Sequence, residues 1–184
     1  MRLSNKISCI VFCNLLLCLS WASGYEIGGP EDRGWVISAE DRAKIMAALP
    51  DQAAVVPKQP RKLLIFDENV VYNGHPSRFY ANLAFQEMGK KTGAFEVVIS
   101  RDPAVFAKEN LATFDAVCLN NTVGNLFENP QYRQNLIEFV YGGGGLMGIH
   151  GTTVAFYRWA DKGKPVDWPE FGRMLGARGA GHRD

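Results

Sequence analysis

This chain of 184 residues has few cysteines and histidines, and neither sign of charge is in clear excess. It contains 4 cysteines and 3 histidines, and its 20 basic residues nearly balance its 19 acidic residues. Proteins that bind nucleic acid or anionic membranes by electrostatic attraction carry a basic surface. Because the formal net charge is only +1, we expect neither nucleic acid nor a charged membrane surface as a partner.

The chain also lacks an apolar run as long as a transmembrane helix, which needs about 20 residues. Its most apolar stretch, residues 7–22, follows a short basic head and ends in small side chains. This order is typical of a secretory signal peptide. We therefore predict that residues 1–24 are removed by cleavage near Gly24-Tyr25, which leaves a periplasmic or secreted protein without a stable membrane anchor.

Cleavage at that point would remove three of the four cysteines, so only Cys118 would remain and no internal disulfide could form. Stability must then come from a packed core, for which a hydrophobic content of 47% is ample. Cys118 lies in the apolar run 116–119, where a neutral buried thiol is the expected state.

The rest of the chain divides into two parts. Residues 25–60 are expected to be an extension with one short helix, because Ser38 begins a capping pattern and prolines follow. Residues 61–184 alternate short apolar runs with helical segments, which is typical of parallel strands joined by helices. We expect strands at 62–67, 95–100, 115–119 and 145–149, and helices at 77–91, 130–141 and 168–176. Together they predict one open, mainly parallel, doubly wound α/β sheet.

Ligands of such sheets bind beyond the carboxyl ends of the strands. We therefore expect function in the loops that begin at Glu68, Arg101, Asn120 and His150.

All three histidines of the chain fall at loop positions. His75 follows the first predicted strand, His150 ends the fourth, and His182 lies near the end of the chain. Histidine suits both proton transfer near neutral pH and metal binding. We predict that the three share a catalytic site, and they are also the candidate ligands of a divalent metal, although their spacing matches no diagnostic metal motif. The alternative is three separate polar loop residues.

Glycines surround His150, as they surround the nucleophile in a sharp strand-to-helix turn. Such turns present a side chain beside backbone N–H groups that stabilise an oxyanion. Imidazole is a poor substitute for a thiolate that must form a thioester. We therefore expect no cysteine-dependent amidotransfer.

Polar and aromatic residues near these loops are candidates for binding a polyol. They are Asn120, Asn121, Thr152 and Trp168. Asparagine is also a common turn residue, and a tryptophan at a helix start often covers the core, so both structural interpretations stay open. Asp67 and Glu68 are second-rank candidates that could orient a histidine, bind a cation or cap the next segment.

Two segments carry a resemblance to a known family. The strings GGGLMGIHGT at 143–152 and DWPEFG at 167–172, together with Gly181-His182, resemble the ThuA-like (trehalose utilisation) family. The resemblance implies a class I glutamine amidotransferase-like, flavodoxin-like fold and a link to sugar utilisation. The matching part of this chain is then residues 61–184. Members of that family continue beyond the position of Asp184, so we expect the domain to be incomplete at its C-terminal end.

The resemblance implies a small-molecule carbohydrate as the partner and leaves the type of activity open. The leading hypothesis is a carbohydrate-active hydrolase, lyase or isomerase that uses histidine acid/base or metal-assisted chemistry. The alternative is a non-catalytic module that binds a sugar or a partner on the same scaffold.

Overall fold

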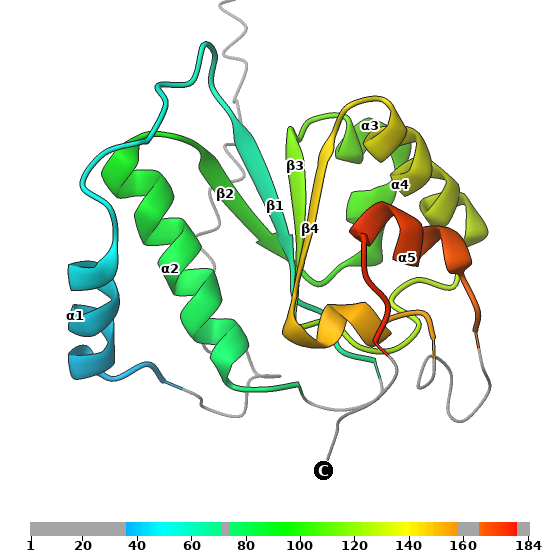
Figure 1. Cartoon of the computed structure of the whole chain (residues 1–184), viewed down its shortest axis with the longest axis horizontal. Coiled ribbons are helices and arrows are strands. Elements are labelled where there is room, and N and C mark those ends of the chain that lie inside the picture. The colour runs from blue at the N-terminus through cyan, green and yellow to red at the C-terminus, as the bar shows by residue number, and fades with distance from the viewer. Residues whose placement is uncertain (1–35, 71–73, 158–165, 180–184) are drawn as a thin grey trace, which may run out of the picture.

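The computed structural model describes residues 36–70, 74–157 and 166–179. Its strands are β1 (Lys62–Phe66), β2 (Glu96–Ser100), β3 (Ala116–Asn120) and β4 (Gly145–Ile149). All of them are parallel, and they form one sheet in the order β2-β1-β3-β4 (Figure 1). The predicted open parallel α/β sheet is therefore confirmed. The predicted signal peptide, residues 1–24, lies outside the described residues.

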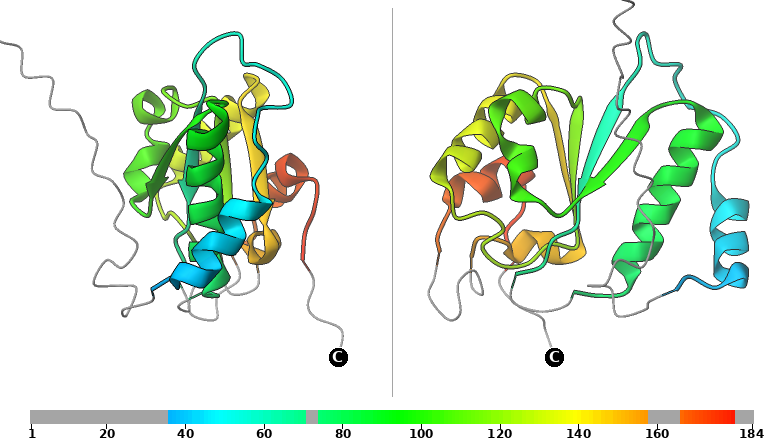
Figure 2. Two further views of the ribbon diagram at one scale, coloured as in Figure 1. Left: turned by 90° about the vertical axis from the view of Figure 1, so that its left-hand side faces the viewer. Right: turned by 180° about the vertical axis from the view of Figure 1, so that it is seen from behind.

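Helices cover both faces of this sheet. They are α1 (Ala39–Ala48), α2 (Ser77–Thr92), α3 (Lys108–Leu111), α4 (Pro130–Tyr141) and α5 (Pro169–Leu175), with the 3-10 turns η2 (Pro103–Phe106) and η3 (His150–Val154). Helix α2 lies against one face with α1 outside it, whereas α3, α4 and α5 lie on the other face (Figures 1 and 2). The arrangement is the three-layered one expected of a doubly wound fold.

The connection between β2 and β3 holds two short helical segments, η2 and α3, in place of one regular crossover helix. Asp102 accepts a hydrogen bond from the N–H of Ala104 at 2.9 Å, and Pro103 begins η2. Turn η2 ends after one turn, and the four-residue helix α3 follows it. Capping by Asp102 together with the fixed φ of Pro103 favours this early start of a tight turn.

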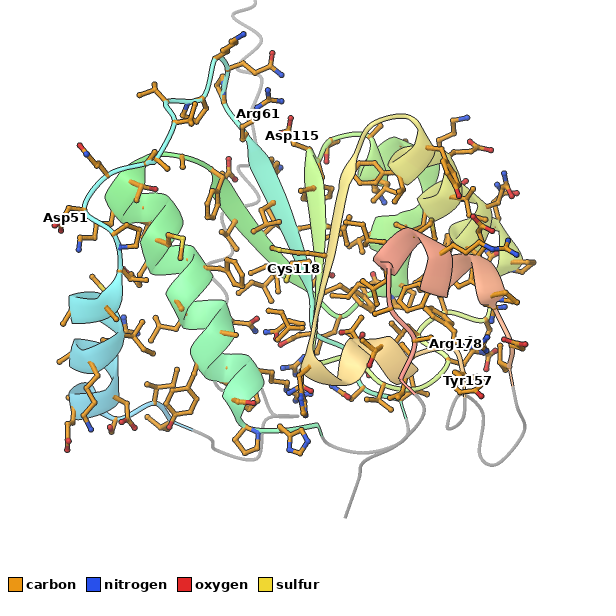
Figure 3. All side chains as sticks on the ribbon, viewed as in Figure 1. Asp51, Arg61, Asp115, Cys118, Tyr157 and Arg178 are labelled. Atoms are coloured by element: carbon orange, nitrogen blue, oxygen red, sulfur yellow. The ribbon has the colours of Figure 1, made fainter. Side chains whose placement is uncertain are left out.

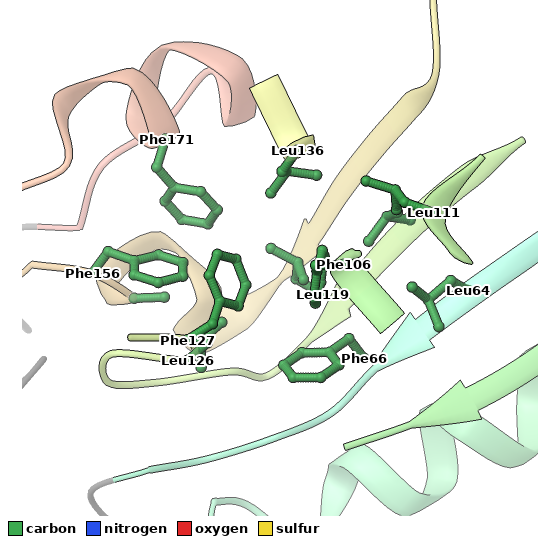
Figure 4. Packing of buried hydrophobic residues seen from close by; sticks show 12 residues of the cluster. Leu64, Phe66, Phe106, Leu111, Leu119, Leu126, Phe127, Leu136, Phe156 and Phe171 are labelled. Carbon is green, nitrogen blue, oxygen red and sulfur yellow. The ribbon is translucent and has the colours of Figure 1, made fainter. Parts of the chain in front are cut away.

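Alternating residues of the central strands fill two separate cores. In β1, Leu64 and Phe66 face the helices α3 to α5, whereas Leu63 and Ile65 face α2. This alternation follows from the two-residue period of a strand. The larger core is rich in aromatic rings, and Figure 4 shows Phe66, Phe106, Phe127, Phe156 and Phe171 packed together in it.

Residues before β1 pack on the outside of α2. The side chain of Ser38 caps α1 by accepting a hydrogen bond from the N–H of Asp41 at 3.0 Å. Tyr80 of α2 donates to Asp41 at 3.2 Å, and Lys91 donates to the carbonyl of Leu49 at 3.0 Å. The short helix predicted in this region is therefore present and is tied to α2 at both ends.

Strand β4 forms one edge of the described sheet. Among the described residues it pairs only with β3, and Met147 in its middle is 37% exposed. Helix α5 approaches β4 closely at Gly148, where a Cβ atom would lie 2.8 Å from Cδ1 of Leu175 and 2.8 Å from Cγ2 of Thr152. A side chain at this position would push α5 away from the strand.

The topological switch point of the sheet, where the chain changes the side to which it adds strands, lies between β1 and β3. From β1 the chain first adds β2 on one side and then crosses to β3 on the other. Ligands of open α/β sheets bind at the carboxyl ends of strands beside such a switch point. The fold therefore directs the search for a site to the residues that follow β1 and β3.

Cys118 lies in the middle of the sheet, as Figure 3 shows, and is fully buried. Burial raises the pKa of its thiol to about 12. At about pH 8 the side chain is therefore neutral, and only the thiolate reacts rapidly with alkylating agents.

We expect native protein to leave Cys118 unmodified by iodoacetamide at about pH 8, and urea-unfolded protein to modify it fully. Peptide mass spectrometry of the two samples measures this directly. Equal labelling of Cys118 before and after unfolding would contradict its burial.

Candidate functional site

The carboxyl ends of β1, β3 and β4 lie along one edge of the sheet. Phe66 of β1 is in register with Leu119 of β3, and Asn120 of β3 is in register with Ile149 of β4. The next residues along each strand are Asp67, Asn121 and His150. The strand register thus gathers a carboxylate, an amide and an imidazole at the edge that the topology indicates.

Two of the three predicted histidines meet at this edge. The rings of His75 and His150 have centroids 5.0 Å apart and planes inclined at 62°. Both residues are exposed. They come from the loop before α2 and from the end of β4, which are 75 residues apart in the chain. We call them the histidine pair. His182 lies outside the described residues.

His150 occupies a sharp turn between β4 and η3. Its φ of 48° lies in the left-handed region, which non-glycine residues rarely adopt. Gly151 follows it, and a Cβ atom there would lie 3.0 Å from Cγ2 of Val123 and 3.1 Å from Oδ1 of Asn121. A side chain at 151 would therefore require Val123 and Asn121 to shift by a few tenths of an ångström. The turn has the strand-to-helix form of a nucleophile elbow, but it presents an imidazole.

Asn121 connects the two segments that carry the histidine pair. It also has a left-handed backbone, with φ 59°, and is only 1% exposed. Its Nδ2 donates to Oγ of Ser77 at 3.5 Å, two residues after His75. Its Oδ1 lies beside Gly151 and has no hydrogen-bond partner among the described residues. Asn121 therefore lies between the two loops and contacts both, and its buried Oδ1 is an acceptor that no described residue uses.

Asn120 and Thr152, two predicted ligand-binding residues, are both fully buried. Nδ2 of Asn120 donates to the carbonyl of Arg78 at 2.9 Å and to Oδ1 of Asn82 at 2.8 Å. Oγ1 of Thr152 donates to the carbonyl of Leu119 at 2.8 Å. In the folded protein these side chains hold the strand ends in place, and direct contact with a ligand stays a prediction for them.

Trp168, the aromatic candidate, packs into the larger core. Its ring stacks on Phe171 with centroids 5.5 Å apart and meets Phe156 edge-on at 4.9 Å. The guanidinium of Arg133 lies 5.4 Å from the ring centroid. Trp168 is partly exposed, and its contacts with these rings are those of a residue that covers the core.

A buried polar network lies directly behind the site, centred on Asp67. The Asp67 side chain is fully buried, and Arg101 donates to it from Nε at 2.9 Å. Asn82 of α2 donates to the same carboxylate at 2.7 Å and accepts from Asn120. The ends of β1, β2 and β3 and the first turns of α2 are thereby joined through side chains.

Sequence reasoning named Asp67 but missed its partners. It places Arg101 only at the start of a loop, and it does not consider Asn82. The sequence does hold a signal that would identify Asn82 as a buried polar residue. It lies between Phe79 and Leu83 on the buried side of α2. A polar residue on an apolar helix face must find a buried partner, because an unpaired one costs about 1–3 kcal/mol.

Arg78 is a further residue that sequence reasoning missed. It is 7% exposed and begins α2 beneath the His75 loop. Its guanidinium lies 4.8 Å from the ring centroid of Phe79 and donates weakly to the carbonyl of Asp67 at 3.5 Å. Gly74 passes close to it, since a Cβ there would lie 3.0 Å from its NH1. Arg78 thus supports the loop that carries His75.

No group of three or more His, Cys, Asp or Glu side chains placed to bind a metal occurs in residues 36–70, 74–157 and 166–179. Helices in the same part of the chain are all too short or too polar to cross a membrane. The predicted three-histidine metal site cannot be placed, because His182 is not among these residues.

Comparisons with known proteins identify one family. Residues 62–184 match the sequence model of the family described as ThuA, trehalose utilisation. The solved structure of a ThuA-like protein from Bacteroides uniformis is similar over 65% of this chain and 45% of its own, with 21% identity and a TM-score of 0.48. This chain therefore spans less than half the length of that protein. No curated protein matches the chain.

The Asp67 network predicts a large effect of removing Arg101. We expect Arg101→Met to lower the free energy of unfolding by about 3–5 kcal/mol, because it leaves a buried carboxylate without its cation. Equilibrium urea unfolding measures the change.

The control is Arg61→Met, which removes the cation of an exposed pair. Arg61 lies 2.6 Å from Asp115, and Figure 3 shows both beside the amino ends of β1 and β3, whereas His150 follows the carboxyl end of β4. A surface pair contributes little, so this variant should lose much less stability. Equal losses in the two variants would show that the Asp67 network has no special importance.

Proposed function

Since the chain belongs to the ThuA (trehalose utilisation) family, we propose that it binds a carbohydrate or sugar derivative at the histidine pair and that His150 acts there as a general acid or base. The contact between the rings of His75 and His150 is the observation that carries the proposal. Imidazole transfers protons efficiently near neutral pH. A second imidazole beside it can relay the proton or hold the substrate hydroxyl in place.

The surroundings of the pair support polyol binding. Hydroxyl groups of a sugar both donate and accept hydrogen bonds, so a site needs groups of both kinds. The two imidazoles offer an N–H donor and a lone-pair acceptor each when neutral, and Oδ1 of Asn121 is an unused acceptor behind them.

The reaction proposed is a hydrolysis, elimination or isomerisation of the carbohydrate. Each of these requires a proton to be removed from or added to an oxygen or carbon of the sugar, which one or two imidazoles can do. Cysteine-dependent amidotransfer is not part of the proposal, because Cys118 is buried in the sheet and its thiol has a raised pKa. The turn at His150 presents no thiol.

The second candidate function is non-catalytic binding of a sugar or a protein partner on the same scaffold. The burial of Asn120 and Thr152 favours it, because two of the polar groups predicted to place a substrate are engaged inside the protein. Only binding, and no product, would then be expected.

Export is also proposed, with removal of residues 1–24 and a location in the periplasm or outside the cell. The basic head and apolar stretch at the start of the chain support this.

Carbohydrate binding should depend on both histidines. We expect isothermal titration of trehalose and other disaccharides, in native and oxidised forms, to show binding that weakens in His75→Asn and His150→Asn. Asparagine is chosen because it tolerates the left-handed backbone at 150 and retains hydrogen-bonding capacity. If His150 is the acid or base, turnover of a bound sugar should be lost in His150→Asn, with affinity reduced much less.

The matched control is Lys108→Ala, an exposed residue of α3 that lies outside the site. It should bind and turn over sugars as the wild type does. Binding without product in wild-type protein would select the non-catalytic function. Equal turnover in wild-type and His150→Asn protein would remove His150 from the mechanism.

The proposed export has its own test. We expect expression of the full chain in a bacterial host to yield protein outside the cytoplasm with Tyr25 as its first residue, as read by N-terminal sequencing. Replacing two apolar residues of the stretch by Leu15→Arg and Leu17→Arg should leave the chain uncleaved in the cytoplasm. A wild-type product that keeps Met1 would contradict the proposal.

A further inference from the structure

The ring separation of the histidine pair matches that of two ligands of one metal ion. Zinc binds imidazole nitrogen at about 2.0–2.1 Å, so two imidazoles at a tetrahedral ion have ring centroids about 5 Å apart. The centroids of His75 and His150 are 5.0 Å apart. No movement of the loops is therefore needed to bring the two rings to the separation that shared ligation requires.

Both histidines are held by parts of the fold that resist movement. His150 follows directly on β4, and the N–H of Asn121 donates to the carbonyl of Ile149 at 3.2 Å just before it. The carbonyl of His75 accepts a hydrogen bond from the N–H of Arg78 at 3.1 Å, which ties the loop to the start of α2. Asn121 joins the two segments through Ser77. A preformed pair loses little conformational freedom when it binds an ion.

Exposure makes the pair accessible to an ion from solution. Both histidines are exposed, whereas Asp67 behind them is fully buried and already paired with Arg101. Imidazole nitrogen is a preferred ligand of Zn²⁺, Ni²⁺ and Cu²⁺, and a poor one for Mg²⁺ or Ca²⁺. The chemistry of the pair therefore selects a divalent transition metal over the alkaline-earth ions.

We propose that His75 and His150 together bind one divalent transition-metal ion of the Zn²⁺, Ni²⁺ and Cu²⁺ class. Residues 36–70, 74–157 and 166–179 supply no third His, Cys, Asp or Glu to a metal-binding group. The proposal therefore names these two ligands only, and water can complete the coordination of the ion. A metal site with open positions is the form that polarises a substrate oxygen or activates a water molecule. The metal site shares its residues with the proposed carbohydrate site, but its existence does not require that a carbohydrate binds.

The experiment is a calorimetric titration of the full chain with Zn²⁺ after removal of bound metal by a chelator. Cys9, Cys13 and Cys18 are first replaced by serine, so that their thiols do not compete for the ion. Cys118 can stay, because it is buried. We expect one Zn²⁺ per chain, and an affinity lowered about tenfold or more in both His75→Asn and His150→Asn. The double variant should bind hardly more weakly than either single one, because each removes the same two-ligand site.

Folding of each variant is checked by thermal unfolding without metal, and His75→Gln and His150→Gly provide second variants if an asparagine variant fails to fold. Glycine is suitable at 150 because it adopts a positive φ without strain. Added Zn²⁺ should also raise the unfolding temperature of the wild type but not that of the variants. Absence of Zn²⁺ binding, or binding that is unchanged in both single variants, would overturn the proposal.

The two proposals on this site can fail separately. Zn²⁺ binding that needs both histidines, with no sugar binding, would support the metal site and contradict the carbohydrate function. Sugar binding in the presence of a chelator, with no Zn²⁺ binding, would support the carbohydrate function and remove the metal.

Discussion

This end of the protein depends on one buried carboxylate, whose charge must be compensated inside the fold. Asp67 is enclosed at the carboxyl end of β1, and Arg101 is the cation that compensates it. Arg101 follows β2, and the other donor, Asn82, comes from α2. One buried charge therefore fixes how two strand ends and a helix meet, and the histidine loop is built on that junction.

Above this junction, the backbone itself is placed under strain. Asn121 and His150 follow neighbouring strands, and both adopt positive φ angles. Such conformations persist only where surrounding contacts determine them, and they gather at functional sites. An exposed imidazole therefore stands at a position where glycine would adopt the same backbone without strain. Its place at the carboxyl end of β4 in such a turn is the physical reason for treating His150 as functional.

The sequence predicted the parallel sheet well, because its strands are continuous apolar runs and buried parallel strands require such runs. The sequence also predicted that His75 and His150 lie at one edge of the sheet, and their rings are 5.0 Å apart, while their shared role in catalysis stays a prediction. The direction in which polar side chains point could not be predicted. Asn120 is buried because Arg78 and Asn82 offer it partners, and those partners come from a helix that is distant in sequence. Trp168 could likewise be placed in the core only once Phe156 and Phe171 were located.

The segment that begins at His150 ends, six residues later, at another residue with a left-handed backbone. Phe156 has a φ of 54°, its N–H donates to the carbonyl of Gly124 at 2.9 Å, and its ring is buried against Phe127. The exposed imidazole and the aromatic core are thus the two ends of one short segment. A substitution that repacks the core at Phe156 would therefore act on the same backbone turn that positions His150.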